Sequence, residues 1–126
     1  MRAYTVAATA VTLGVPKKWI DNVLSHHPIE GVVRARQGIV RRVTPAGLLT
    51  LEIALHLHRT VEIPIRAALE IATRLKNSEG REVLLSENPP ITLRVDVDGL
   101  TRSLGTRLQR ALEITPTPRR GRPPRK

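Results

Sequence analysis

Residues 5–27 read TVAATAVTLGVPKKWIDNVLSHH, and this stretch decides how the first half of the chain folds. Small apolar residues before Gly14 predict a short helix over residues 5–13, which Gly14 ends. A second helix is expected over about residues 16–26, with Pro16 in its first turn. Two short helices joined at a glycine turn predict a helix-turn-helix. Ala10 is small where the two helices would cross, and the space between them would be filled by Leu13, Val15, Ile20 and Val23. The apolar side of the second helix also carries Trp19 and Leu24.

The other side of the second helix is polar, and it carries Lys17, Lys18, Asp21, Asn22 and Ser25. In a helix-turn-helix the second helix lies in the major groove of DNA, where side chains of its first turns reach base edges. The two lysines could contact guanine or phosphate, and Asn22 could pair with adenine. Asp21 would either accept from cytosine or hold a lysine in place. The ordinary alternative is a helical hairpin that only forms core, and the surrounding positive charge favours DNA binding over it.

An arginine-bearing hairpin is expected next, in residues 32–43, which read VVRARQGIVRRV. Two β-branched runs flank Arg36-Gln37-Gly38, a pattern typical of a β-hairpin. Thr44 and Pro45 then predict an N-cap and first position of a helix that continues to about Arg59. Pro64 opens a further helix over about residues 64–76. The cations of the hairpin are Arg34, Arg36, Arg41 and Arg42.

A second, smaller unit is expected over residues 81–114. Two strands flank the turn ENPP, and Asp98 is the expected N-cap of a last helix. One stripe of that helix is apolar and contains Leu100, Leu104, Leu108 and Ala111. A hairpin with one helix is too small to be stable alone. It must therefore pack on the first unit or pair with another copy, and we expect a dimerisation or partner-binding unit.

The chain has 126 residues and a formal net charge of +10, which is concentrated at its two ends. Residues 1–42 hold seven basic and two acidic side chains, residues 43–114 hold nine of each, and residues 115–126 hold five basic and no acidic ones. Localised positive charge predicts a polyanionic partner, with nucleic acid ahead of an anionic membrane.

The composition also excludes several kinds of chemistry and structure. No cysteine is present, which excludes disulfides, zinc–thiolate sites and thiol chemistry. No run approaches the roughly 20 apolar residues of a membrane span. Threonines interrupt the apolar start of the chain and lysines follow it, so we expect a helix there rather than a secretory signal, and a cytoplasmic protein. No carboxylate pair, phosphate loop, nucleophile motif or metal-ligand spacing stands out, so no enzyme, cofactor or metal is expected.

The order of helix-turn-helix, arginine hairpin, capped helix and second helix resembles the winged domain of MerR-type regulators over about residues 4–76. The stretch GIVRRVTPAGLLTLEIALHLHRTVEIPIRAALEIA is similar to that family's wing and the two helices after it. The resemblance implies groove binding by helix and wing, with Arg41 and Arg42 on phosphates. The family usually has an arginine and an aromatic in the second helix, where this chain has Asp21, Asn22 and Val23. Its long dimer helix and effector site are not visible here, so metal or drug sensing is not implied.

The last twelve residues, TPTPRRGRPPRK, carry four prolines and no large apolar side chain, so neither helix nor sheet interior is expected there. The core Arg120-Gly121-Arg122-Pro123 resembles the AT-hook, flanked here by Arg119, Arg125 and Lys126. Gly121 would let the backbone approach the floor of the narrow, negative minor groove of A·T-rich DNA. Arg120 and Arg122 would meet adenine N3 and thymine O2, which a guanine amino group would obstruct in G·C pairs. The alternatives are a basic solubilising tail and a polybasic membrane patch.

Together these features predict a mainly α protein with small β-hairpins, of the α+β class. A MerR-like winged helix-turn-helix domain would span residues 1–76, a hairpin and helix residues 81–114, and a disordered AT-hook-like tail residues 115–126. We expect a homodimeric transcriptional regulator or nucleoid-associated protein that binds A·T-rich double-stranded DNA. The alternative is an antitoxin that represses its own promoter and masks a toxin. RNA binding is less favoured, because the stacking aromatics of single-strand readers are missing.

Overall fold

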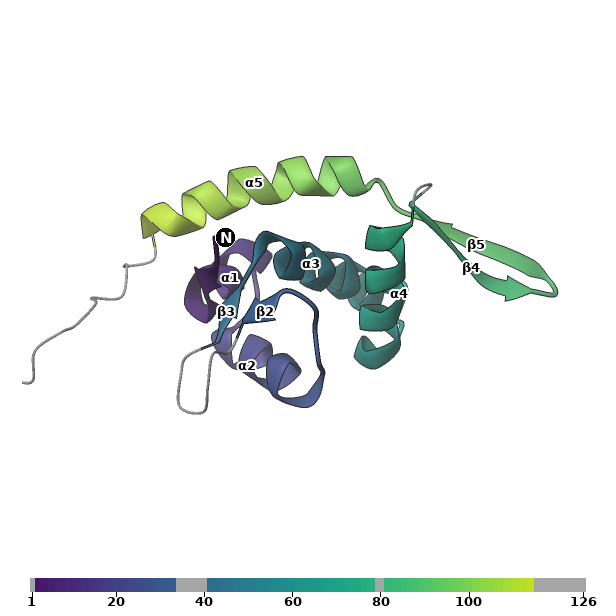
Figure 1. The fold of residues 1–126 in the computed structure, drawn as a ribbon, viewed down its shortest axis with the longest axis horizontal. Helices are drawn as coiled ribbons and strands as arrows, with labels where there is room; N and C mark the ends of the chain where they lie inside the picture. The colour runs from purple at the N-terminus through teal and green to yellow at the C-terminus, as the bar shows by residue number, and fades with distance from the viewer. Residues whose placement is uncertain (1, 34–40, 79–80, 115–126) are drawn as a thin grey trace, which may run out of the picture.

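Helices form most of the described chain, and two small antiparallel sheets accompany them (Figure 1). The structure is a computed structural model that describes residues 2–33, 41–78 and 81–114. The expected α+β class is confirmed at this level. None of the helices in these ranges is both long enough and apolar enough to cross a membrane.

The first two helices are α1 (Val6–Leu13) and α2 (Lys17–His26), joined at Gly14. The Thr5 side chain accepts from the Ala8 amide at 3.0 Å and caps α1. Gly14 adopts a left-handed conformation with φ 72°, which a residue without Cβ reaches at little cost. Ile20 is fully buried where α2 meets the core. The predicted pair of helices is confirmed, but Pro16 is the N-cap of α2 rather than a residue of its first turn.

Three short strands form a sheet in which β3 (Arg42–Val43) lies between β1 (Tyr4–Thr5) and β2 (Val32–Val33). Val32 and Tyr4 both pair with Val43, from opposite sides. The predicted pairing of β2 with β3 is confirmed. The strand β1 was not predicted, because two residues beside a helix N-terminus carry no recognisable alternation.

The next two helices are α3 (Pro45–Thr60) and α4 (Ile65–Asn77), which pack against each other. Thr44 caps α3, as predicted, and its hydroxyl also donates to the Gly31 carbonyl at 2.7 Å. Each helix buries an alanine completely, Ala54 in α3 and Ala68 in α4. Small buried side chains allow helices to approach closely, and the packing of α3 on α4 forms the centre of the fold.

The chain then forms the hairpin of β4 (Glu82–Glu87) and β5 (Pro90–Arg94), followed by α5 (Val97–Ile114). The hairpin projects away from the helices, whereas α5 returns across α1 and α3 (Figure 1). The predicted stripe of α5 is confirmed: Leu104 and Ala111 are buried, and Leu100 and Leu108 are partly buried. The sequence left open whether this helix packs on the first unit of the chain or pairs with another copy. In the structure it packs on α1 and α3 of the first unit.

The predicted N-cap of α5 was wrong. The Gly99 amide donates to the Asp96 carboxylate at 3.0 Å, and the Leu100 amide donates to the Asp96 carbonyl. Asp98 instead lies in the first turn of the helix, where a negative charge is still favourable. The two aspartates are equally good caps in isolation, so the sequence alone did not distinguish them.

Candidate nucleic-acid interface

One face of α2 gathers the polar side chains that the sequence analysis singled out. Lys17, Lys18, Asn22 and Ser25 are exposed, and Asp21 is partly exposed. The opposite face of the helix holds Ile20, Val23 and Leu24, all buried. Because these apolar residues anchor the helix in the core, its polar face is held outward without a further partner among the described residues. This face could meet a flat or grooved surface along three turns.

Within this face, Lys17 and Asp21 form an ion pair, with 3.6 Å between Nζ and Oδ2. They lie four residues apart, which places them on adjacent turns of the helix. The Lys17 and Asp21 side chains are 63% and 45% exposed, so the pair contributes little to stability. Two roles were expected for Asp21. In the structure its carboxylate contacts Lys17, which corresponds to the role of holding a lysine in place.

Two further cations lie on and beside β3. Arg42 is exposed within the strand, and Arg41, just before it, is partly exposed. Arg42 pairs with Thr5, the residue directly before α1, whereas Lys17 follows the turn directly after α1. The helix between these positions has 8 residues and is therefore about 12 Å long. Basic side chains thus flank both ends of α1.

The remaining predicted contacts lie outside the described residues. They comprise Arg34 and Arg36 of the hairpin and all of the tail positions, namely Arg119, Arg120, Gly121, Arg122, Pro123, Arg125 and Lys126. The structure therefore places seven of the predicted contact residues, five on α2 and two at β3.

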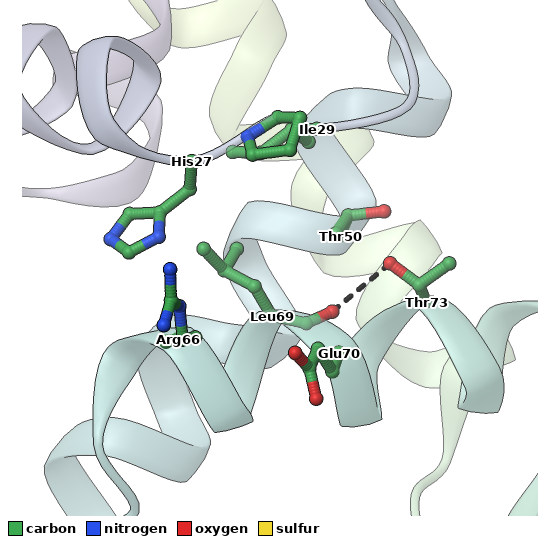
Figure 2. A pocket seen from close by; sticks show the side chains of 8 residues that line it. His27, Ile29, Thr50, Arg66, Leu69, Glu70 and Thr73 are labelled. Carbon is green, nitrogen blue, oxygen red and sulfur yellow. Dashed lines mark hydrogen bonds between the residues drawn. The ribbon is translucent and has the colours of Figure 1, made fainter.

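A separate pocket of about 290 Å³ lies between the turn after α2, α3 and α4. Figure 2 shows the Arg66 guanidinium beneath the His27 ring at this pocket. The two threonine hydroxyls of the pocket already donate to backbone carbonyls: Thr73 to Leu69 at 3.0 Å and Thr50 to Ala46 at 3.1 Å. With these hydroxyls engaged, the remaining polar side chains that line the pocket are those of His27, Arg66 and Glu70. In the part of the chain that the structure describes, no three potential metal ligands come together.

One polar cluster was missed by sequence reasoning. Glu52 of α3 is buried and forms an ion pair with Arg107 of α5, while His56 approaches it at 3.4 Å. The only sequence pattern that pointed to it is the position of Glu52 between Leu51 and Ile53 on a helix that is apolar almost all round. Arg107 also donates to the Thr12 carbonyl of α1, so the cluster joins three helices, and it lies away from the polar face of α2.

No protein-family model, curated protein or solved structure matches the chain.

Proposed function

We propose that the chain binds double-stranded DNA, with α2 in the major groove and the arginines at β3 on the backbone beside it. The finer architecture that we propose is a MerR-like winged helix-turn-helix, formed by α1, α2 and the β2–β3 hairpin. The observation that carries the proposal is the two-sided α2. Its apolar face is buried, and its outward face presents lysine, asparagine and serine, which are the side chains that read base edges and phosphates.

The placement of the cations supports this arrangement. Arg42 pairs with Thr5, the residue directly before α1, and Lys17 begins α2 just after the turn that follows α1. A helix in the groove and a hairpin on the backbone beside it would therefore engage neighbouring parts of one duplex.

The proposed role is that of a transcriptional regulator or nucleoid-associated protein. A·T preference would come from the tail, in which Arg120, Gly121 and Arg122 supply an AT-hook-like core. A single short helix-turn-helix binds weakly, and regulators of this type usually meet two-fold sites as dimers. We therefore propose a homodimer as the active form.

The test measures affinity of the full chain for A·T-rich duplex, G·C-rich duplex and single strands by fluorescence anisotropy at several salt concentrations. Combining Lys17→Ala with Lys18→Ala should weaken duplex binding, and the slope of log affinity against log salt should fall by about 0.9 for each phosphate that the variant no longer neutralises. The matched control combines Arg102→Ala with Arg110→Ala, which removes the same charge from the exposed side of α5.

In Figure 1, α5 lies on the far side of α1 and α3 from α2. The control should therefore retain most of its affinity. Equal losses in the two double variants would mean that net charge alone attracts DNA, and an unchanged Lys17/Lys18 variant would remove α2 from the interface.

A further inference from the structure

The β4–β5 hairpin exposes apolar side chains that the helical body does not cover. At its base, Val83 is buried and contacts between α4 and β4 hold the hairpin. The Val95 amide also donates to the Arg81 carbonyl at 3.2 Å. Further out, Leu84, Leu85 and Ile91 are 45%, 42% and 47% exposed. Isolated two-stranded hairpins are marginally stable in water, so a partner on the outer part of this one would stabilise it.

The charge of the hairpin argues against nucleic acid as that partner. Its strands carry two carboxylates, on Glu82 and Glu87, and one guanidinium, on Arg94. With Arg81 at the base the charges of the hairpin balance, and apolar side chains without excess positive charge fit a protein surface. Within the described ranges, β4 and β5 pair only with each other, so each strand offers an outer edge for a further strand.

The two edges differ in how well they would accept a second copy of the chain. If β4 paired antiparallel with β4 of the second copy over its full length, Glu82 of each copy would face Glu87 of the other. Like charges directly opposite are destabilising, and this pairing creates two such contacts. A bulge between Leu84 and Ser86 also interrupts the regularity of β4. Both features disfavour pairing at this edge.

The edge of β5 has neither defect. Its only charged residue is Arg94, at one end. When two copies of β5 pair antiparallel over their full length, Thr92 faces its own copy, Ile91 faces Leu93, and Arg94 faces Pro90. Ile91 and Leu93 share a face of the strand with Val83, because directly paired residues and residues two apart point the same way. The pairing therefore extends the apolar face across both copies.

We propose that the outer edge of β5 is a dimerisation surface for a second copy of this chain, forming a four-stranded sheet in the order β4–β5–β5–β4 with a two-fold axis at Thr92. The antiparallel arrangement directs the bases of the two hairpins away from each other. Since each hairpin projects from its own helical body (Figure 1), the two bodies would lie at opposite ends of the joint sheet. This surface would form the homodimer of the proposed function, on which the inference rests, but the test of the surface needs no DNA.

The test uses Thr92, which is exposed and would lie next to its own copy on the two-fold axis. Light scattering coupled to gel filtration, performed on the full chain over a range of concentrations, should show a dimer for the wild type. Thr92→Lys and Thr92→Glu should each raise the dimer dissociation constant roughly tenfold or more, because each places two like charges side by side. An equimolar mixture of the two variants should restore the dimer, because unlike charges then face each other.

Two controls keep the result specific. Leu85→Lys adds the same charge to the other strand and should leave the dimer intact. Thr92→Val, which keeps a β-branched residue, should also stay dimeric. The proposal is overturned by a wild-type monomer at every concentration, by variants of Thr92 that stay dimeric, or by a mixture that stays monomeric. None of these outcomes alters the test of Lys17 and Lys18 on DNA.

Discussion

Arg107 of α5 and Glu52 of α3 form an ion pair between residues that are 55 positions apart in the chain. The Glu52 side chain is 1% exposed, and that of Arg107 is 35% exposed. Arg107 also donates to the carbonyl of Thr12 in α1, at 3.0 Å. A single guanidinium therefore connects three helices, and it holds α5 in the position where its apolar stripe is covered.

Arg107→Ala should destabilise the fold by about 3 kcal/mol, because it leaves a buried carboxylate without its main partner. The remaining neighbour, His56, is largely exposed and compensates little. Urea denaturation followed by circular dichroism would measure the difference.

The matched control is the double variant in which Glu52→Leu accompanies Arg107→Met. It removes both charges and fills the space with apolar atoms, so it should recover most of the missing stability. If the double variant were as unstable as Arg107→Ala, the ion pair would not be the cause, and poorer packing around the arginine stem would explain the effect.

The sequence predicted the helices well because their periodicity and end residues are local features. Gly14, Thr44 and the apolar stripe of α5 each act within a few residues of where they lie in the chain. The link between Glu52 and Arg107 is different, since charged residues are normally expected at the surface. The apolar neighbours of Glu52 were the only local sign of its burial, and its partner Arg107 reaches it because α5 returns across α3, which no local pattern indicates.

Part of the candidate interface was predictable, because it also depends on local helical periodicity. The polar face of α2 follows from helical periodicity, and the structure confirms that this face points outward. The ion pair of Lys17 with Asp21 was one of two roles left open, because spacing alone does not distinguish an intrahelical contact from a contact with a base. The exposure of the outer part of the β4–β5 hairpin depends on the direction in which it leaves the body, which sequence alone does not specify.

Gly31 and Gly47 permit a close backbone approach between the turn before β2 and the start of α3. A Cβ added to Gly47 would lie 2.7 Å from the Gly31 carbonyl oxygen, which is closer than real contacts allow. Gly47→Ala should therefore destabilise the fold by about 2 kcal/mol, as overpacking commonly does.

Gly105→Ala serves as the control for the same chemical change within a helix. Nothing lies within 4 Å of a Cβ at this position of α5. It should stabilise the fold by about 1 kcal/mol, because alanine favours the helical state more than glycine does. Thermal melts of the two variants should shift in opposite directions; shifts of the same sign would mean that the contact of Gly31 with Gly47 relaxes freely.

Asp21→Asn distinguishes the two roles of that carboxylate on DNA. If Asp21 chiefly holds Lys17, the variant should bind all duplexes more tightly and with a steeper salt dependence, because a charge that repels phosphate is removed and Lys17 is released. If Asp21 instead reads cytosine, affinity for the preferred site should fall by about 1–3 kcal/mol while other sequences change little. Anisotropy titrations on specific and random duplexes separate these outcomes, and we expect the first.

The tail prediction rests on the sequence of residues 115–126. Removing residues 116–126 should leave the melting temperature nearly unchanged, because this segment contains no large apolar side chain that a core could lose. The truncation should weaken DNA binding and reduce its salt dependence, by about 0.9 in slope for each phosphate that the tail had neutralised. A simple cationic tether predicts the same result, so truncation alone does not identify a minor-groove hook.

Gly121→Ala separates these two explanations, because it keeps every charge and adds one methyl group where the backbone would approach the groove floor. A hook should lose its preference for A·T-rich over G·C-rich duplex while keeping much of its non-specific affinity, since the added methyl group keeps the chain from the acceptors at the base of the groove. The measurement is the ratio of the two affinities for the wild type and the variant at one salt concentration. An equal ratio in both proteins would show that the tail attracts DNA by charge alone, and the A·T preference would then have to come from α2 or be abandoned.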